Sequence, residues 1–170
     1  MKRAGQNPPY WIDLSFRNLM HTNYGITRPQ FYCPSNNKWN RDDFWKWPSS
    51  DATVMAYCYF AGEPNYNSDP VLLRANPTQP VFAQKNTDPA FYKIIMVDLI
   101  RKLDGNWRRP GDPDPLVRGV NHFRYQGDQP EGANQVYMDG HVEWINANRF
   151  IQFPKMIQGS TQIFFDGAQQ

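Results

Sequence analysis

The sequence of 170 residues contains no run of about 20 consecutive apolar residues, which is the length that a membrane-spanning helix needs. Small and polar residues and prolines follow Met1, Lys2 and Arg3, so the printed sequence shows neither an export signal nor an anchor. The motifs of serine hydrolases, phosphate-binding loops and dinucleotide-binding folds do not occur in it either. We therefore expect no transmembrane helix and none of these common catalytic centres.

An excess of charge of either sign is also missing. Lys and Arg number 18 and Asp and Glu number 16, so the net charge is +2, and the charged residues are scattered along the chain. Because nucleic-acid-binding proteins carry a clustered basic surface, this composition disfavours nucleic acid as a partner.

Aromatic residues and proline, by contrast, are abundant. Aromatic residues make up 15% of the chain and charged residues 20%, a balance common in exported proteins. The 15 prolines recur in turn-like contexts, which predicts many loops and short regular elements. The length is that of one domain, so we expect residues 1–170 to form a single domain.

Local patterns predict several short elements. Residues 13–21 are predicted to form a helix that Asp13 caps. Residues 54–60 are β-branched and aromatic and predict a strand, and residues 159–167 predict a last strand. Residues 88–105 fit either a helix or a buried strand, because a continuous apolar run does not separate the two.

The stretch NQVYMDGHVEW, which starts at residue 134, predicts a β-hairpin. Asp139 and Gly140 fit a two-residue type I′ turn, because both residues tolerate a positive φ. Such a turn pairs Tyr137 with Val142 and places both on one face with Trp144. We therefore expect that face to be packed.

Cys33 and Cys58 are the two cysteines of the chain. In an oxidising compartment they could form a disulfide that closes a loop with 24 intervening residues and adds about 3 kcal/mol of stability. Otherwise they are two buried thiols, and the sequence leaves both alternatives open.

Three tryptophans, Trp39, Trp45 and Trp47, occur in the otherwise polar residues 38–47. Their spacing does not describe a helical stripe, so we expect them to cover the core from a loop or an irregular helix. The alternative is an aromatic contact surface that stacks on a sugar or on another protein chain.

Several segments, taken in order, resemble the globular part of bacterial prepilin-like proteins. These are type II secretion pseudopilin-like proteins with a C-terminal motif of His, a spacer and Asp-Gly. The resemblance extends over about residues 12–146, and its most specific part is Asn-x-x-[Tyr/Phe]-x-Asp-Gly-His-Val. The segments that carry it are FYCPS (31–35), AYCYF (56–60), IMVD (95–98), NH (121–122) and ANQVYMDGHV (133–142).

The resemblance implies an α+β fold with a pilin-like globular domain, in which a short N-terminal helix packs on an antiparallel β-sheet with long proline-rich loops. It also favours a turn or short helix at residues 88–92, followed by a strand at residues 94–98. Two features differ from the family. The spacer is longer than usual, and the printed chain begins with neither a prepilin peptidase site nor a long apolar helix.

The residues that match the family motif are expected to be structural, because the resemblance carries over no catalytic centre. Gly140 supplies a positive φ, the carboxylate of Asp139 accepts turn amides, and Asn134 caps the loop that enters the hairpin. His122 and His141 complete the matching set, and 16 residues lie between His122 and Asp139.

The leading hypothesis is a non-enzymatic, exported structural or interaction domain that acts outside the cell, at the cell surface or in the periplasm. We expect protein partners, through self-association or in a filament or secretion-type assembly. A second hypothesis is carbohydrate binding by the three tryptophans. A thiol nucleophile with His122 as its base is disfavoured, because neither cysteine occurs at a helix start beside a cation.

A further alternative is a divalent-metal site formed by Asp98, His122, Asp139 and His141. Histidines with carboxylates suit zinc, whereas calcium would suit a site made only of aspartate and backbone oxygens. No pair among the four has the tight spacing of a His-x-x-x-His motif, and a single histidine beside a turn is most simply a strand residue.

Overall fold

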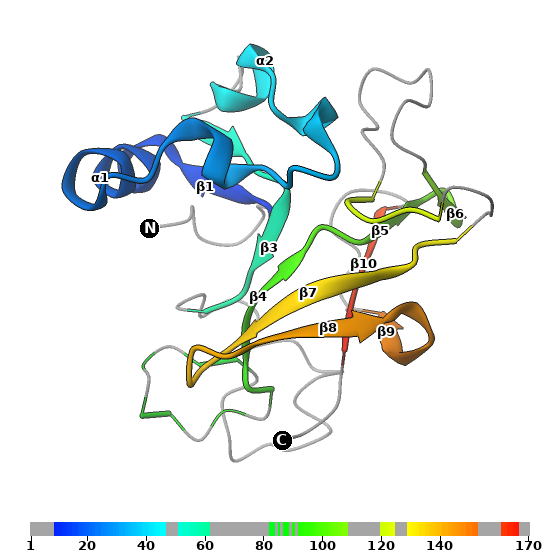
Figure 1. Cartoon of the computed structure of the whole chain (residues 1–170). Coiled ribbons are helices and arrows are strands. Elements are labelled where there is room, and N and C mark those ends of the chain that lie inside the picture. The colour runs from blue at the N-terminus through cyan, green and yellow to red at the C-terminus, as the bar shows by residue number, and fades with distance from the viewer. Residues whose placement is uncertain are drawn as a thin grey trace.

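The computed structural model describes residues 9–46, 51–61, 82–83, 85, 87–88, 90, 92–108, 120–124, 129–152 and 161–166. These ranges combine helices with antiparallel sheets, so the α+β architecture is confirmed (Figure 1). The helices are α1 (Leu14–Tyr24) and α2 (Asp42–Trp45), with short 3₁₀ helices at Arg28–Phe31, Asn37–Trp39 and Ala147–Arg149. The strands are β1 (Trp11–Asp13), β2 (Ala52–Val54), β3 (Tyr57–Tyr59), β4 (Ile94–Asp98), β5 (Arg101–Leu103), β6 (Asn106–Trp107), β7 (Gly132–Tyr137), β8 (Val142–Asn146), β9 (Phe150–Gln152) and β10 (Thr161–Asp166).

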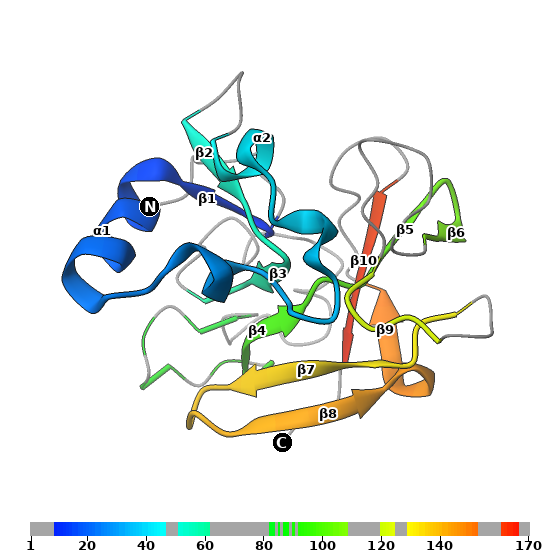
Figure 2. The same cartoon turned by 45° about the horizontal axis from the view of Figure 1, so that its top comes forward.

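Three antiparallel sheets organise these elements. β1 pairs with β2, a second sheet has the order β6-β5-β10-β9, and a third has the order β3-β4-β7-β8. In both views the N-terminal elements α1, β1, α2 and β2 gather near β3, at one edge of the third sheet. β7 and β8 lie toward the opposite edge of that sheet (Figures 1 and 2). No helix in the described ranges is both long and apolar enough to cross a membrane.

The N-terminal helix forms close to where the sequence predicts it. Asp13 occupies the position before the first helical residue, but its side chain makes no capping hydrogen bond. Gly25 ends the helix with a left-handed backbone (φ 66°), which glycine adopts without steric cost. α1 lies beside β1 and β2, and its Phe16 reaches Tyr59 of β3, with ring centroids 6.4 Å apart.

The predicted strand at residues 54–60 is divided between two sheets. β2 ends at Val54 and β3 begins at Tyr57, and between them the backbone N–H of Met55 donates to Tyr10 and that of Ala56 donates to Phe31. The chain therefore leaves the first sheet and enters the third within two residues.

The conflict over residues 88–105 is resolved in favour of strands. β4 and β5 take the place of the alternative helix, and Leu99 between them bonds to Ala56 of the neighbouring segment. Residues 88–92 are described only in part, and there the backbone N–H of Ala90 donates to the carbonyl of Asp88. The last strand forms as predicted, as β10.

The hairpin of β7 and β8 forms, but its register differs by one residue from the prediction. Gln135 pairs with Glu143 and Val136 with Val142. The turn has three residues rather than two. The N–H of Gly140 donates to the carbonyl of Tyr137, the N–H of Tyr137 donates to the carbonyl of His141, and Gly140 has φ 89°. A type I turn followed by a left-handed glycine is the common three-residue alternative to the type I′ turn.

This register changes which side chains share a face. Ala133, Gln135 and Tyr137 are buried together with Ile145, whereas Trp144 is 43% exposed on the opposite face. The prediction that Trp144 packs with Tyr137 is therefore wrong, because a shift of one residue moves a strand side chain to the other face.

An aromatic core lies between the third sheet and β10. The rings of Phe60 and Phe82 stack with centroids 4.6 Å apart. The ring of Phe165 on β10 packs against both, with centroid distances of 5.5 Å and 5.8 Å. All three side chains are fully buried, so this cluster fixes the sheet that carries the candidate site.

Candidate functional site

Asp98, the last residue of β4, is the centre of a buried hydrogen-bond network. Its side chain is only 2% exposed. Oδ2 accepts bonds from the backbone N–H of Asn134 at 2.7 Å and from its side-chain amide at 2.9 Å, and Oδ1 accepts from the amide of Asn121 at 2.9 Å. Because a buried charge needs such partners, the network accounts for a carboxylate at this depth.

The loop that carries Asn121 and His122 is held on both sides of the site. The Asn121 amide also donates to the carbonyl of Ala56 at 2.6 Å, and its backbone N–H donates to Leu99. Asn36, which is itself buried, donates to the carbonyl of Val120 at 3.1 Å. These bonds fix the loop against the end of β4 and against the N-terminal segment.

His122 lies against Asp98 and Trp144. Its Nε2 is 3.0 Å from Oδ2 of Asp98, and its ring meets the ring of Trp144 edge-on, with centroids 5.0 Å apart. Trp144 in turn packs on Gly132, where an added Cβ would lie 2.6 Å from the indole ring. The indole ring of Trp144 and the carboxylate of Asp98 together fix the orientation of the imidazole.

The ionisation of both groups follows from these contacts. Hydrogen bonding to Asp98, and then to Cys33, raises the pKa of His122 to about 10. Burial alone would raise the pKa of Asp98, but hydrogen bonds from His122, Asn134 and Asn121 outweigh it and lower the pKa. In the absence of another cation, the pair is an imidazolium and a carboxylate near neutral pH.

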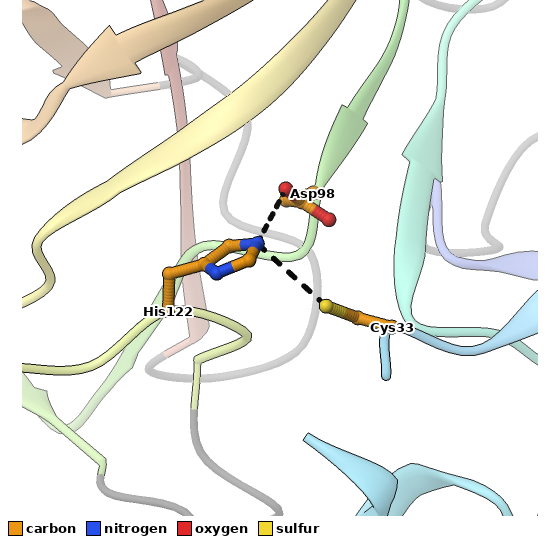
Figure 3. Close-up of side chains that lie close together, drawn as sticks. All are labelled: Cys33, Asp98 and His122. Atoms are coloured by element: carbon orange, nitrogen blue, oxygen red, sulfur yellow. Dashed lines mark hydrogen bonds and ion pairs between the residues drawn. The ribbon is translucent and has the colours of Figure 1, made fainter. Parts of the chain in front are cut away.

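Cys33 approaches the same imidazole nitrogen from the N-terminal segment. Its Sγ is 3.6 Å from Nε2 of His122 (Figure 3). Two backbone hydrogen bonds fix this segment. The N–H of Asn36 donates to the carbonyl of Cys33 and closes a turn, and the N–H of Ala56 donates to the carbonyl of Phe31. The sulfur, the nitrogen and a carboxylate oxygen all lie within 4.8 Å of one another, so these three residues could hold a divalent cation.

A cavity of about 460 Å³ adjoins the three side chains. Gln30, Ser35 and Tyr57 contribute polar groups to its lining, and Met96 and Val136 contribute apolar ones. The arrangement therefore has free volume beside it that a small molecule or water can occupy.

One imidazole nitrogen faces both Cys33 and Asp98, which differs from the geometry of a nucleophile–base pair. In such a pair one ring nitrogen accepts the thiol proton while the other donates to the orienting carboxylate. Here a bare Nε2 facing Cys33 would also place its lone pair 3.0 Å from Oδ2 of Asp98. A proton on Nε2, or a cation between Nε2, Sγ and Oδ2, suits this arrangement better than proton transfer from the thiol to the imidazole does.

No disulfide joins Cys33 and Cys58, and both thiols are buried. Of the two alternatives that the sequence leaves open, the structure therefore has the two buried thiols. Cys58 lies on β3 and pairs with Val97 of β4. Both cysteines belong to the hydrophobic core, and Cys33 also faces His122.

The four residues of the predicted metal site separate into two pairs. Asp98 and His122 meet as described, but Asp139 and His141 bond to each other at the hairpin turn, with 2.6 Å between Oδ1 and Nδ1. The ring of His141 stacks on the ring of Tyr137, with centroids 4.3 Å apart. The carboxylate of Asp139 also accepts the N–H of His141, as a turn aspartate does.

Two residues of the network were not among those predicted for the metal site, and one has a different role. Cys33 and Asn121 contact Asp98 or His122 only because distant loops meet, although the Asn-His pair at 121–122 was a signal that could have suggested Asn121. Asn134 lies within β7 and bonds Asp98, so it does not cap the loop that enters the hairpin.

The predicted aromatic contact surface does not form as such. Trp39 is 1% exposed and belongs to the core, so it cannot stack on a sugar. The half-buried ring of Trp45 is covered by the guanidinium of Arg17 at 4.3 Å. Trp47 lies outside the described residues.

The pair formed by Asp98 and His122 predicts a pH dependence of stability in the metal-free protein. The lowered pKa of Asp98 stabilises the fold above its ordinary value of 3.8, and this contribution is lost as the pH falls through the lowered value. The raised pKa of His122 contributes fully below 6.5 and is lost as the pH rises through about 10. We expect maximal stabilisation by the pair between pH 4 and 6.5.

Thermal unfolding of wild type and of His122→Asn, followed from pH 4 to pH 10 with a chelator present, measures this dependence. The difference in Tm between the two proteins should shrink as the pH rises. His141→Asn, at a histidine whose side chain is 40% exposed, serves as the control and should retain the wild-type profile. A difference in Tm that stays constant with pH would contradict the assignment.

Comparison with protein families, with curated proteins and with solved structures finds no match for the chain. The resemblance to pseudopilin-like proteins therefore stays a prediction from the sequence segments, and the function is argued from the residues themselves.

Proposed function

We propose that this chain is an exported, non-enzymatic, pseudopilin-like domain that works through contacts with other protein chains in a filament or secretion-type assembly. The observation that carries the proposal is the exposed apolar surface of β8. Val142 is 60% exposed and Trp144 is 43% exposed, and both lie on the same face of the strand. Paired apolar side chains of this size on one strand favour a contact surface.

The position of β8 supports the same proposal. In the described part of the third sheet, β8 pairs with β7 alone and forms the edge of the sheet. An exposed edge strand presents backbone donors and acceptors to which a strand of another chain can add. The partner that we propose for this edge is a second copy of the chain, because repeated copies build a filament.

The half-buried side chains beside β8 extend the apolar surface. Val136 on β7 pairs with Val142, and Met96 on β4 pairs with Val136, so the three lie in a row across the sheet on one face. The geometry of the imidazole of His122 is unsuited to activating Cys33, which speaks against catalysis by a thiol nucleophile.

The proposal predicts that a charge at the edge weakens self-association. Val142→Lys places an ammonium group at the centre of the proposed contact, where its desolvation opposes binding, and should raise the dissociation constant at least about tenfold. Sedimentation velocity over a concentration series measures the constant.

Leu19→Lys is the matched control, since Leu19 is 46% exposed but lies on α1. This variant should associate like the wild type. A wild-type chain that is strictly monomeric at high concentration, and that binds no partner in its source, would overturn the proposal.

A further inference from the structure

We infer that Cys33, Asp98 and His122 form a zinc-binding site. Their side chains reach one point from three separate segments, namely the loop after the first 3₁₀ helix, the end of β4 and the loop at residues 120–124 (Figure 3). A thiolate, an imidazole and a carboxylate are all zinc ligands, and the sulfur makes calcium or magnesium a poor match.

Two of the distances between ligand atoms are close to those of a tetrahedral ion. Bonds of about 2.3 Å to sulfur and about 2.0–2.2 Å to nitrogen and oxygen place neighbouring ligand atoms about 3.4–3.6 Å apart. The separation of Sγ of Cys33 and Nε2 of His122 is already 3.6 Å. Nε2 and Oδ2 of Asp98 are 3.0 Å apart, so they need to separate by about 0.4 Å when an ion replaces the proton between them.

The surrounding hydrogen bonds orient the ligands. Asn121 holds Oδ1 of Asp98, and the backbone N–H of Asn134 holds Oδ2, so the carboxylate keeps its direction when His122 turns to the ion. Trp144 contacts the imidazole edge-on and restricts its rotation. Binding releases the thiol proton and the Nε2 proton to solvent, and the ion takes their place.

The fourth coordination position is left to water. All three ligands line the cavity of about 460 Å³, so a tetrahedral ion with three protein ligands has an open side facing it. The exposed pair Asp139 and His141 offers only two side-chain ligands at the hairpin turn and does not complete such a set.

Cobalt(II) titration of the 170-residue chain, under reducing conditions after treatment with a chelator, tests the inference. One Co²⁺ per chain should bind with a sulfur-to-cobalt charge-transfer band and the intense visible bands of tetrahedral coordination, and Zn²⁺ should displace it. Cys33→Ser should abolish the charge-transfer band and weaken Zn²⁺ binding at least about tenfold, since loss of even an outer partner weakens metal sites about 10–100-fold.

Cys58→Ala and His141→Ala are the matched controls, because they remove the other thiol and the hairpin histidine. Both should keep the wild-type spectrum and Zn²⁺ affinity. Circular dichroism with chelator present establishes that Cys33→Ser is folded, and His122→Gln provides a second variant that removes a ligand.

Absence of stoichiometric binding by the wild type would overturn the inference, as would a charge-transfer band that survives Cys33→Ser or disappears in Cys58→Ala. The inference does not depend on self-association. Titration at concentrations where the chain is monomeric therefore separates its outcome from that of the proposed function.

Discussion

Replacing Asp98 with alanine is expected to lower the free energy of unfolding by about 3–5 kcal/mol, because buried donors lose their common acceptor. The amides of Asn121 and Asn134 and the ring of His122 now bond to this carboxylate. Without it the buried amide of Asn121 keeps only its bond to the carbonyl of Ala56, and the half-buried imidazolium loses its counter-charge. Equilibrium unfolding in urea, near pH 6 and with a chelator present, measures the loss.

Asp139→Ala is the matched control, because Asp139 also pairs with a histidine, His141, at 2.6 Å. The side chain of Asp139 is 71% exposed, so water replaces the lost contact and the urea midpoint should stay close to that of the wild type. Asp98→Asn, which keeps the volume and one acceptor, should fall between the two. Equal losses for Asp98→Ala and Asp139→Ala would show that burial of the network contributes nothing.

Trp39→Ala is expected to destabilise the protein by a similar amount, about 3–5 kcal/mol. The ring is 1% exposed and contacts Phe44 and Tyr10 at centroid distances of 5.4 Å and 6.4 Å. The guanidinium of Arg101, itself buried, lies 4.8 Å from the indole centroid. Removal of the ring leaves a cavity and also takes away the nearer of the two aromatic partners of this cation, the other being Tyr10 at 5.5 Å.

The same substitution at Trp144 tests whether burial explains the effect. Trp144 is 43% exposed, so Trp144→Ala should cause a much smaller loss of stability in the same urea experiment. A loss as large as that of Trp39→Ala would mean that packing on Gly132 and His122 matters more than burial. Neither outcome depends on self-association if the protein concentration is low.

The fold was predictable where local pattern decides the structure. The N-terminal helix, the hairpin and the last strand follow from apolar spacing and turn residues, whereas the strand at residues 94–98 was favoured over a helix only by the family resemblance. The hairpin register was not predictable, since Asp-Gly fits both a two-residue turn and the end of a three-residue turn. That choice moved Trp144 from the expected core face to the side of His122.

The site was predictable only in part. An aspartate at a strand end and a histidine in the resembling segment drew attention to Asp98 and His122. Cys33 could not be added, because its approach to His122 depends on how loops 89 positions apart pack. Asp139 and His141 were predicted to join Asp98 and His122, but the hairpin turn directs these two side chains toward each other instead.

The buried network also bears on how the protein folds. Asp98 bonds to residues 24 and 36 positions along the chain, whereas the hairpin that supplies Asn134 is local. Contacts of long sequence separation close large loops and form after local ones, so we expect the Asp98 network to assemble late. Interactions absent from the folding transition state act on the unfolding rate. Asp98 and its donors would then govern how long the native state persists, with little influence on how quickly it forms.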